Sequence, residues 1–194
     1  MTARPVPLVI AIDGPSGSGK SSVSRAVAQR LDLAYLDTGA MYRALTWWCA
    51  QQGIDLEDQS AVARAAKDLP LNMGTDPSSP SVQVAGVVIS EAIRTTVISE
   101  SVSKVATNLG VRDELRDRQR SLIAQSVEHS GGVVAEGRDI TTVVVGTPAA
   151  TQRPRVWRGN RGQSGAGSHG TPQTTRSPSS ACWTSPSRSR ATSR

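Results

Sequence analysis

Residues 14–21 read Gly-Pro-Ser-Gly-Ser-Gly-Lys-Ser, which is the complete pattern of a phosphate-binding loop. The apolar run at residues 7–12 precedes this loop and predicts a buried strand, and residues 21–31 follow it and predict a helix. In that context the glycines let backbone N–H groups turn toward phosphate oxygens, and the helix N-terminus adds a partial positive charge. The pattern therefore predicts a nucleoside triphosphate site rather than a chance glycine-rich turn.

The side chains of the loop predict a division of roles within it. Lys20 is expected to reach the β- and γ-phosphates as a catalytic cation, and the hydroxyl of Ser21 is expected to ligate Mg²⁺. We expect the nucleotide to be bound by nine consecutive residues, which are Gly14, Pro15, Ser16, Gly17, Ser18, Gly19, Lys20, Ser21 and Ser22.

Two more short apolar runs, residues 34–37 and 133–136, predict strands that helices separate from the first strand. Strands that alternate with helices favour a parallel α/β sheet, in which ligands gather at the carboxyl ends of the strands. A polar cluster follows each predicted strand: the phosphate-binding loop, Asp37-Thr38-Gly39 and Gly137-Arg138-Asp139. We therefore expect one composite site.

The remaining elements are predicted from apolar spacing and from end signals. They are helices at residues 40–52, 60–69, 95–108 and 111–127, a turn-rich stretch at 72–80 and an antiparallel hairpin at 82–89. Ser60 is the predicted N-cap of the second of these helices, and Pro70 is its predicted stop.

Two arginines predict a second anion site beside the nucleotide. Arg43 lies in the first turn of the helix predicted to begin at residue 40, and Arg138 directly follows a predicted buried strand. Guanidinium groups bind phosphate well, so two facing phosphate sites suggest phosphoryl transfer to a phosphorylated acceptor. The alternatives are a solvated helix position for Arg43 and a simple turn for Asp139.

Three further arginines, Arg112, Arg116 and Arg120, recur at helical spacing. Asp113 and Asp117 stand where they can pair with such a face. We expect at least two of the three arginines to belong to a solvated, ion-paired helix surface.

The chain joins two different compositions. Residues 146–194 contain eight Arg and no Lys, Asp or Glu, whereas the preceding residues have 14 basic and 16 acidic side chains. Ser, Thr, Gly and Pro make up 27 of the last 49 residues, which leaves too little apolar surface to offset the entropy of ordering them. We therefore expect residues 1–145 to form the folded core, and residues 146–194 to be a basic low-complexity tail that is disordered or read out of frame.

Neither of the two cysteines, Cys49 and Cys182, has the spacing of a metal site or a disulfide framework. The sequence contains no leader pattern and no apolar run of membrane-spanning length. We expect a cytoplasmic monomer with free thiols, and neither a membrane nor a nucleic acid as its partner.

Five segments, in this order, resemble bacterial cytidylate kinases. They are Ile12-Asp-Gly-Pro-Ser-Gly-Ser-Gly-Lys-Ser-Ser22, Leu36-Asp-Thr-Gly-Ala-Met-Tyr-Arg43, Ser90-Glu-Ala-Ile-Arg-Thr95, Val111-Arg112 and Glu136-Gly-Arg-Asp139. The resemblance covers residues 6–145 and implies transfer of the γ-phosphoryl group of ATP to CMP or dCMP with Mg²⁺. It also implies the P-loop nucleoside monophosphate kinase fold, an α/β parallel sheet flanked by helices, with a small antiparallel insert at residues 70–95.

The resemblance assigns roles in acceptor binding as well. Arg43 and Arg138 correspond to the arginines that grip the acceptor phosphate, and the insert corresponds to the segment that closes over the monophosphate. The residues implied to read cytosine are Ser103, Arg112 and Asp139, and those implied to line the pocket are Thr38 and Tyr42. Cytosine has an amine donor that a carboxylate accepts, and two acceptors that guanidinium and hydroxyl groups satisfy.

After Val145 the family pattern is no longer recognisable. The resemblance predicts a further strand, an arginine-bearing lid over ATP and a closing helix, whereas this chain continues with the tail. We therefore expect an incomplete sheet, with the first strand at an apolar edge. Two alternatives stay open: another small P-loop kinase, such as a shikimate kinase, and a nucleotide-binding product without catalytic activity.

Overall fold

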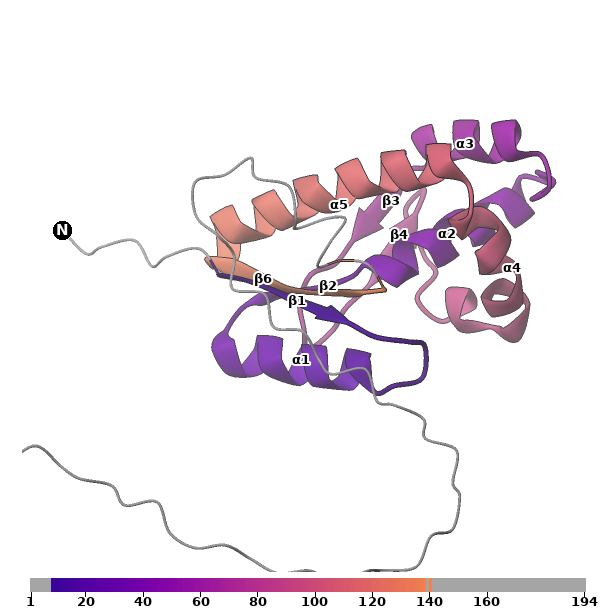
Figure 1. Cartoon of the computed structure of the whole chain (residues 1–194). Coiled ribbons are helices and arrows are strands. Elements are labelled where there is room, and N and C mark those ends of the chain that lie inside the picture. The colour runs from indigo at the N-terminus through magenta and orange to yellow at the C-terminus, as the bar shows by residue number, and fades with distance from the viewer. Residues whose placement is uncertain (1–7, 139, 141–194) are drawn as a thin grey trace, which may run out of the picture. The chain divides into compact units, whose positions relative to one another are not determined.

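The computed structural model describes residues 8–138 and residue 140. Asp139 and the tail at residues 146–194 therefore lie outside the described residues. The main sheet consists of β1 (Leu8–Asp13), β2 (Ala34–Asp37) and β6 (Gly132–Gly137), in the order β1-β6-β2 with every pair parallel. Helix α1 (Lys20–Leu31) covers one face of this sheet and helix α5 (Leu109–Ser130) covers the other (Figure 1). The predicted α/β fold with a parallel sheet is confirmed.

Strand β6 is the centre of the main sheet, and all six of its residues are buried. Its alternating side chains supply two cores: Val133 and Ala135 pack with α2 and α5, whereas Val134 packs with Tyr35 under α1. A side chain at Gly132 would collide with the carbonyl oxygen of Leu8, so glycine lets β6 lie close against β1. Among the described residues β1 has a neighbouring strand on its β6 side only.

The predicted helices are all present, and side chains cap the N-termini of three of the described helices, namely those capped by Asp37, Asp58 and Asn108. The remaining helical elements are α2 (Thr38–Gln51), α3 (Gln59–Lys67), the short 3₁₀ turn η1 (Ala92–Arg94) and α4 (Thr96–Ala106). The prediction that Ser60 caps α3 is wrong, because the carboxylate of Asp58 accepts the hydrogen bond from the Ala61 N–H at 2.9 Å. Ser60 instead donates its hydroxyl proton to the same carboxylate.

A second, antiparallel sheet forms the insert, with β3 (Leu71–Met73), β4 (Val82–Val84) and β5 (Val87–Val88) in sequence order. The predicted hairpin is confirmed, and Ala85 and Gly86 at its turn both have positive φ, as a tight twisted hairpin requires. The turn-rich interpretation of residues 72–80 missed β3. This strand is only three residues long, and its bonds come entirely from β4 rather than from any local pattern.

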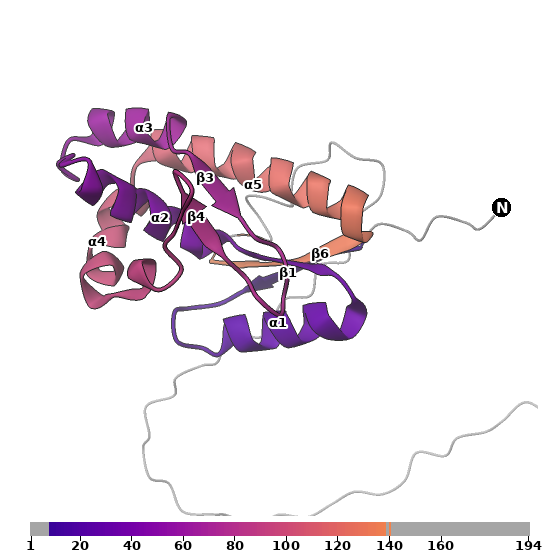
Figure 2. The same cartoon turned by 180° about the vertical axis from the view of Figure 1, so that it is seen from behind.

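The connection from β3 to β4 reaches back to α1, as Figure 2 shows from behind. The guanidinium of Arg25 on α1 donates to the carbonyl oxygens of Pro77 and Ser78, at 3.0 and 3.2 Å. The backbone N–H of Tyr35 on β2 donates to the carbonyl oxygen of Thr75 at 2.8 Å. The insert is therefore anchored to the main sheet and to the helix that follows the phosphate-binding loop.

Helices α2, α3, α4 and α5 surround the larger core beside the insert (Figure 1). Asn108 joins two of them, because its side chain caps α5 through the Val111 N–H and donates to the carbonyl oxygen of Gln59 at 2.6 Å. Within the described residues, none of the helices is both long and apolar enough to cross a membrane.

Asn108→Ala is expected to lower the free energy of unfolding by about 1–2 kcal/mol, because it removes an N-cap and the hydrogen bond that joins α5 to the Gln59 carbonyl oxygen. Urea unfolding followed by circular dichroism measures this. Ser121→Ala is the matched control, since it removes an exposed hydroxyl from the same helix and should change stability by less than about 0.5 kcal/mol. Equal losses in the two variants would contradict the structural role given to Asn108.

Candidate active site

The phosphate-binding loop lies between the carboxyl end of β1 and the N-terminus of α1. Gly17 and Gly19 both adopt positive φ, at 76° and 75°, which a residue with a side chain rarely does. The Gly14 N–H donates to the Gly137 carbonyl oxygen at 3.2 Å, which ties the loop to β6. Gly19 is the N-cap of α1 and has no side chain to cap it, so the first N–H groups of α1 are open toward the loop.

Glu136 lies at the carboxyl end of β6, directly below the loop lysine. Its side chain is 2 % exposed, and its Oε2 atom stands 3.9 Å from the Nζ atom of Lys20. Oε1 accepts a hydrogen bond from the hydroxyl of Tyr35 at 2.5 Å, but Oε2 is fully buried and accepts none from the described residues. A buried carboxylate oxygen in this state is costly unless a cationic partner arrives. Glu136 stands in the motif Glu136-Gly-Arg-Asp139, and no role for its side chain is predicted from the sequence.

Tyr35 lies on β2, and its hydroxyl donates to Oε1 of Glu136 on the neighbouring strand β6. Burial, followed by the hydrogen bond to Glu136, raises the pKa of Tyr35 well above its usual value of 10. The phenol therefore keeps its proton at neutral pH and remains the donor to Glu136.

A second cluster follows β2. Asp37 caps α2 by accepting from the Ala40 N–H at 2.9 Å, and its other oxygen accepts from Arg43 at 2.8 Å. Because α2 begins at Thr38, Arg43 lies in the second turn of the helix, not in the first as predicted. Asp37 occupies one edge of its guanidinium, while the Nε–H is buried without a hydrogen-bond partner.

Thr38 links the two clusters. Its buried hydroxyl donates to the backbone carbonyl oxygen of Glu136 at 2.7 Å, so it fixes the start of α2 against the end of β6. A side chain at Gly137 would approach this hydroxyl to 2.6 Å, which explains the glycine. At the same edge, the Asp13 carboxylate accepts from the Ile140 N–H at 2.8 Å and holds the chain that follows β6.

The other predicted acceptor residues stand on separate elements. Arg138 is exposed directly after β6, and Tyr42 is half-buried on α2. Ser103 is exposed on α4, and Arg112 lies in the first turn of α5. The hydroxyl of Ser103 donates to the Glu100 carbonyl oxygen within its own helix. The roles given to these residues, and to Asp139 outside the described residues, stay predictions.

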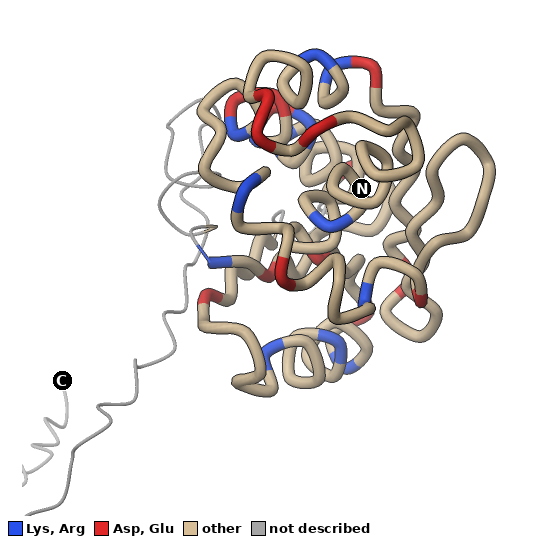
Figure 3. Tube along the Cα trace, turned by 90° about the vertical axis from the view of Figure 1, so that its right-hand side faces the viewer, with Lys and Arg blue, Asp and Glu red and all other residues tan. Residues whose placement is uncertain are grey.

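The solvated face predicted for α5 is confirmed. Arg116 pairs with Asp113 at 2.7 Å, and Arg120 pairs with Asp117 at 3.7 Å. Figure 3 shows basic and acidic positions interleaved along the described chain rather than separated into faces of one sign. Exposed ion pairs of this kind contribute little to stability. Of the three arginines at helical spacing, only Arg112 is also predicted to bind the acceptor.

Two cavities are found among the described residues, and one of them borders the site. A small one of about 20 Å³ lies between the main sheet and the insert and is lined by Tyr35, Asp37, Ser90 and Arg94, among others. Arg94 belongs to the motif at residues 90–95, and no role for it is predicted from the sequence. Only the fold brings it to the lining of this cavity.

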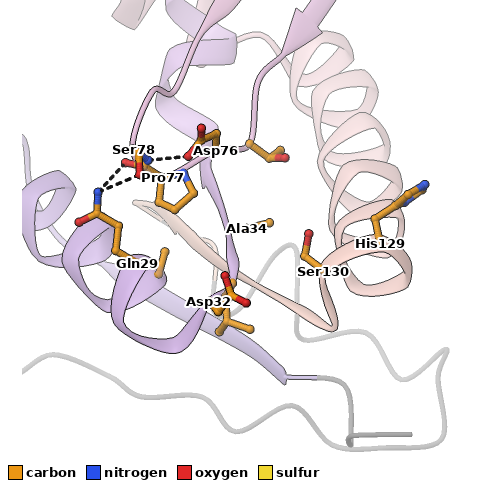
Figure 4. Close-up of a pocket in the computed structure, with 11 residues that line it drawn as sticks. Gln29, Asp32, Ala34, Asp76, Pro77, Ser78, His129 and Ser130 are labelled. Atoms are coloured by element: carbon orange, nitrogen blue, oxygen red, sulfur yellow. Dashed lines mark hydrogen bonds between the residues drawn. The ribbon is translucent and has the colours of Figure 1, made fainter.

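The larger cavity, about 690 Å³, lies away from the phosphate-binding loop. Figure 4 shows its walls, which include Gln29 on α1, Asp32 directly after α1, the segment around Pro77, and His129 at the end of α5. It borders the amino end of β2, whereas ligands of parallel sheets collect at carboxyl ends. We therefore assign the chemistry to the edge of the main sheet that carries the phosphate-binding loop, and not to the larger cavity.

Comparison with known proteins agrees with this geometry. The family model described as cytidylate kinase matches residues 10–151. The chain belongs to the cytidylate kinase family. A cytidylate kinase of Streptomyces avermitilis is 51% identical over 144 residues, covering 74% of this chain and 61% of that protein. A cytidylate kinase of Nocardia farcinica is 49% identical over 144 residues, covering 74% of this chain and 60% of the relative.

A bifunctional pantoate ligase/cytidylate kinase of Thermosynechococcus vestitus is also similar, at 44% identity over 138 residues, covering 70% of this chain and 26% of that protein. The chain thus spans about three fifths of the length of the single-function cytidylate kinases it matches. The family match extends past Val145, where the recognisable pattern was expected to end, to residue 151.

Substitutions of Asp37 test the cluster that Asp37 forms with Arg43 and the start of α2. Asp37→Asn keeps an acceptor for the Ala40 N–H but loses the charge that holds Arg43, whereas Asp37→Ala loses both. We expect Asp37→Ala to be less stable than Asp37→Asn by about 1 kcal/mol, the contribution of an N-cap. We also expect Asp37→Asn to lie below the unchanged chain by up to about 1 kcal/mol, the contribution of a partly exposed ion pair. Urea unfolding measures both differences.

Asp58 is the matched control, because it caps α3 in the same way and shows no ion pair to arginine among the contacts described. Asp58→Asn should be close to neutral, and Asp58→Ala should lose the cap. If Asp37→Asn were as neutral as Asp58→Asn, the ion pair with Arg43 would contribute nothing to folding.

Proposed function

We propose that this chain is a cytidylate kinase, which transfers the γ-phosphoryl group of ATP to CMP or dCMP and releases ADP with CDP or dCDP. The observation that carries the proposal is that two cationic side chains stand at the carboxyl ends of neighbouring parallel strands: Lys20 faces Glu136 at the end of β6, and Arg43 pairs with Asp37 at the end of β2. Similarity to proteins named cytidylate kinase supports the choice of reaction. Since both substrates are free nucleotides, we expect the enzyme to act as a cytoplasmic monomer.

The donor half of the site would hold the triphosphate of ATP. The open N–H groups at the start of α1 face phosphate oxygens in a loop of this kind, and the loop glycines keep side chains out of the way. At 3.9 Å, Lys20 is only loosely paired with Glu136, so its ammonium group is free to move onto the β- and γ-phosphates.

The residues of the loop edge also fit a magnesium ion. Ser21 supplies a hydroxyl oxygen, and the buried Oε2 atom of Glu136 supplies an acceptor for a hydrated cation once Lys20 has turned to the phosphates. Hard oxygen donors of this type, few in number, are the ligands that Mg²⁺ takes together with nucleotide phosphates. When bound, Mg²⁺ neutralises charge on the β- and γ-phosphate oxygens.

The acceptor half would hold CMP at the ends of β2 and β6. Arg43, pre-oriented by Asp37, directs an unpaired buried Nε–H to the site, and Arg138 follows β6 at the surface. We propose that these two arginines grip the acceptor phosphate and that Arg94 adds a third positive charge from the insert. Thr38 and Tyr42 would line the same pocket.

The base would be read from the opposite side of the acceptor. We propose that Asp139 accepts a hydrogen bond from the cytosine amine, and that Ser103 and Arg112 donate to its ring acceptors. A uracil in the same place would present a carbonyl oxygen to the Asp139 carboxylate and leave both acceptors unpaired. Such a mismatch of buried polar groups is the kind that gives strong discrimination.

The phosphoryl transfer requires correct placement of the two nucleotides and neutralisation of the negative charge on their phosphates. An oxygen of the CMP phosphate attacks the γ-phosphorus, and the bond from that phosphorus to the oxygen bridging to the β-phosphate breaks in line. Lys20, Arg43 and Arg138 would stabilise negative charge on the two ends of this reaction. Their fixed positions supply the orientation that free reactants lack.

Lys20→Ala is expected to lower kcat about 100-fold or more, because it removes a preorganised positive charge from the transferring phosphoryl group. Coupled ADP release measures this with ATP, Mg²⁺ and a panel of CMP, dCMP, UMP and AMP. Turnover should be confined to CMP and dCMP. Lys67→Ala, which removes an exposed lysine from α3, is the matched control and should leave turnover unchanged.

A chimera separates failure of the chemistry from failure of this particular chain. In it, the residues after Val145 are replaced by the corresponding part of the Streptomyces avermitilis relative. If the chain is inactive but the chimera turns over CMP, the described residues carry the predicted chemistry without completing it. If UMP, AMP or a non-nucleotide acceptor reacts better than CMP in both proteins, the proposal is wrong.

A further inference from the structure

The connection between β3 and β4, residues 74–81, is a loop with a fixed shape. The Gly74 N–H donates to the Ser81 carbonyl oxygen at 2.8 Å and closes the base of the loop, where a side chain at Gly74 would collide with the Ser81 hydroxyl. At the tip, the Asp76 carboxylate accepts from the Ser78 N–H at 2.7 Å, which forms an Asx turn. Figure 4 shows this turn beside Gln29 of α1.

Arg25 on α1 is the main donor to the tip of this loop. Its Nε and Nη2 atoms donate to the carbonyl oxygens of Pro77 and Ser78 at 3.0 and 3.2 Å, and its side chain is half-buried. Two hydrogen bonds from one planar guanidinium fix the orientation of the tip as well as its distance from α1. Gln29, one turn further along, adds longer contacts to Pro77 and Ser78 at 3.4 and 3.5 Å.

The base of the same loop lies on the acceptor side. Gly74, Pro80 and Ser81 line the small cavity together with Asp37 and Arg94. The loop is short and closed by a hydrogen bond at its base, so a displacement of its tip also moves its base. The position of the tip on α1 therefore helps to set the position of the wall that faces Asp37.

Other contacts keep the insert folded without Arg25. Strands β3 and β4 pair over three residues each, and the Tyr35 N–H donates to the Thr75 carbonyl oxygen at 2.8 Å. Loss of the guanidinium should therefore release the tip of the loop while the small sheet stays intact.

We propose that Arg25 is a positioning residue for the acceptor nucleotide, acting through the loop at residues 74–81 and touching neither nucleotide. The proposal rests on the acceptor half of the proposed function. Its consequence is selective, because both hydrogen bonds that the structure gives the Arg25 side chain go to the insert. Arg25 should matter for binding of CMP and matter little for binding of ATP, although it stands on the helix that begins at Lys20. A merely structural role would affect both nucleotides or neither.

The test is isothermal titration calorimetry of the full chain with CMP and, separately, with a non-hydrolysable ATP analogue and Mg²⁺. Arg25→Ala should weaken CMP binding about 5–20-fold, because a loop that is correctly placed only about one tenth of the time lowers the apparent affinity about tenfold. It should change binding of the ATP analogue less than about twofold.

Two further variants show whether the guanidinium itself is responsible. Arg25→Lys keeps the charge and a donor but loses the planar pair of hydrogen bonds, and should restore CMP binding to within about threefold of the unchanged chain. Arg30→Ala removes an exposed arginine from the same helix and is the matched control, which should change binding of neither nucleotide.

A double-mutant cycle identifies the route of the effect. Asp76→Ala removes the Asx turn at the tip, and Asp76 is not among the residues that line the small cavity. Alone it should weaken CMP binding at least about threefold. In an Arg25→Ala background it should weaken CMP binding less than about twofold further, because the carbonyl oxygens that it orients have already lost their donor. Asp76→Ala also serves if Arg25→Ala does not fold, which thermal melting reveals.

Three results would overturn the inference: unchanged CMP binding in Arg25→Ala, equal weakening of both nucleotides, or additive effects of Arg25→Ala and Asp76→Ala. A wild-type chain that binds both nucleotides but does not phosphorylate CMP would leave the inference intact and count against the proposed function alone. A wild-type chain that binds the ATP analogue but not CMP would overturn both.

Discussion

The buried carboxylate of Glu136 is the interaction around which the site is built. Burying a carboxylate in a sheet is costly, and the fold offsets only part of this cost. Tyr35 donates to Oε1, and Lys20 stands 3.9 Å from Oε2, which accepts no hydrogen bond from the described residues. Thr38 donates to the backbone carbonyl oxygen of the same residue, so the start of α2 is held at the strand end that also faces the loop lysine.

Asp37 shows how one short side chain can serve local structure and site geometry together. One of its oxygens caps α2 and the other orients Arg43, six residues along the same helix. The space around this pair is limited, because a side chain at Gly39 would lie 3.2 Å from Asp37 and 3.3 Å from Arg43. Helix formation therefore brings the acceptor-side arginine into place without contacts from distant segments.

The insert is coupled to the nucleotide side by backbone hydrogen bonds rather than by packing alone. Arg25, one turn beyond Ser21 on α1, holds the carbonyl oxygens of Pro77 and Ser78. The Tyr35 N–H donates to the carbonyl oxygen of Thr75, so the residue whose hydroxyl binds Glu136 also anchors the insert through its main chain. Movement of the insert over an acceptor would thus start from points fixed to the donor half.

Local patterns in the sequence were sufficient for the phosphate-binding loop, the parallel α/β arrangement and every helix, because glycine spacing, apolar periodicity and capping residues act within a few positions of the chain. The same local reasoning misplaced the N-cap of α3, where Asp58 competes successfully with Ser60, and missed β3, whose hydrogen bonds come from β4. The contacts of Glu136 with Tyr35 and Lys20 could not be predicted, since the three residues lie on separate elements. They meet only because β2 and β6 pair side by side beneath α1, and burial then makes the hydrogen bond to the Glu136 carboxylate important.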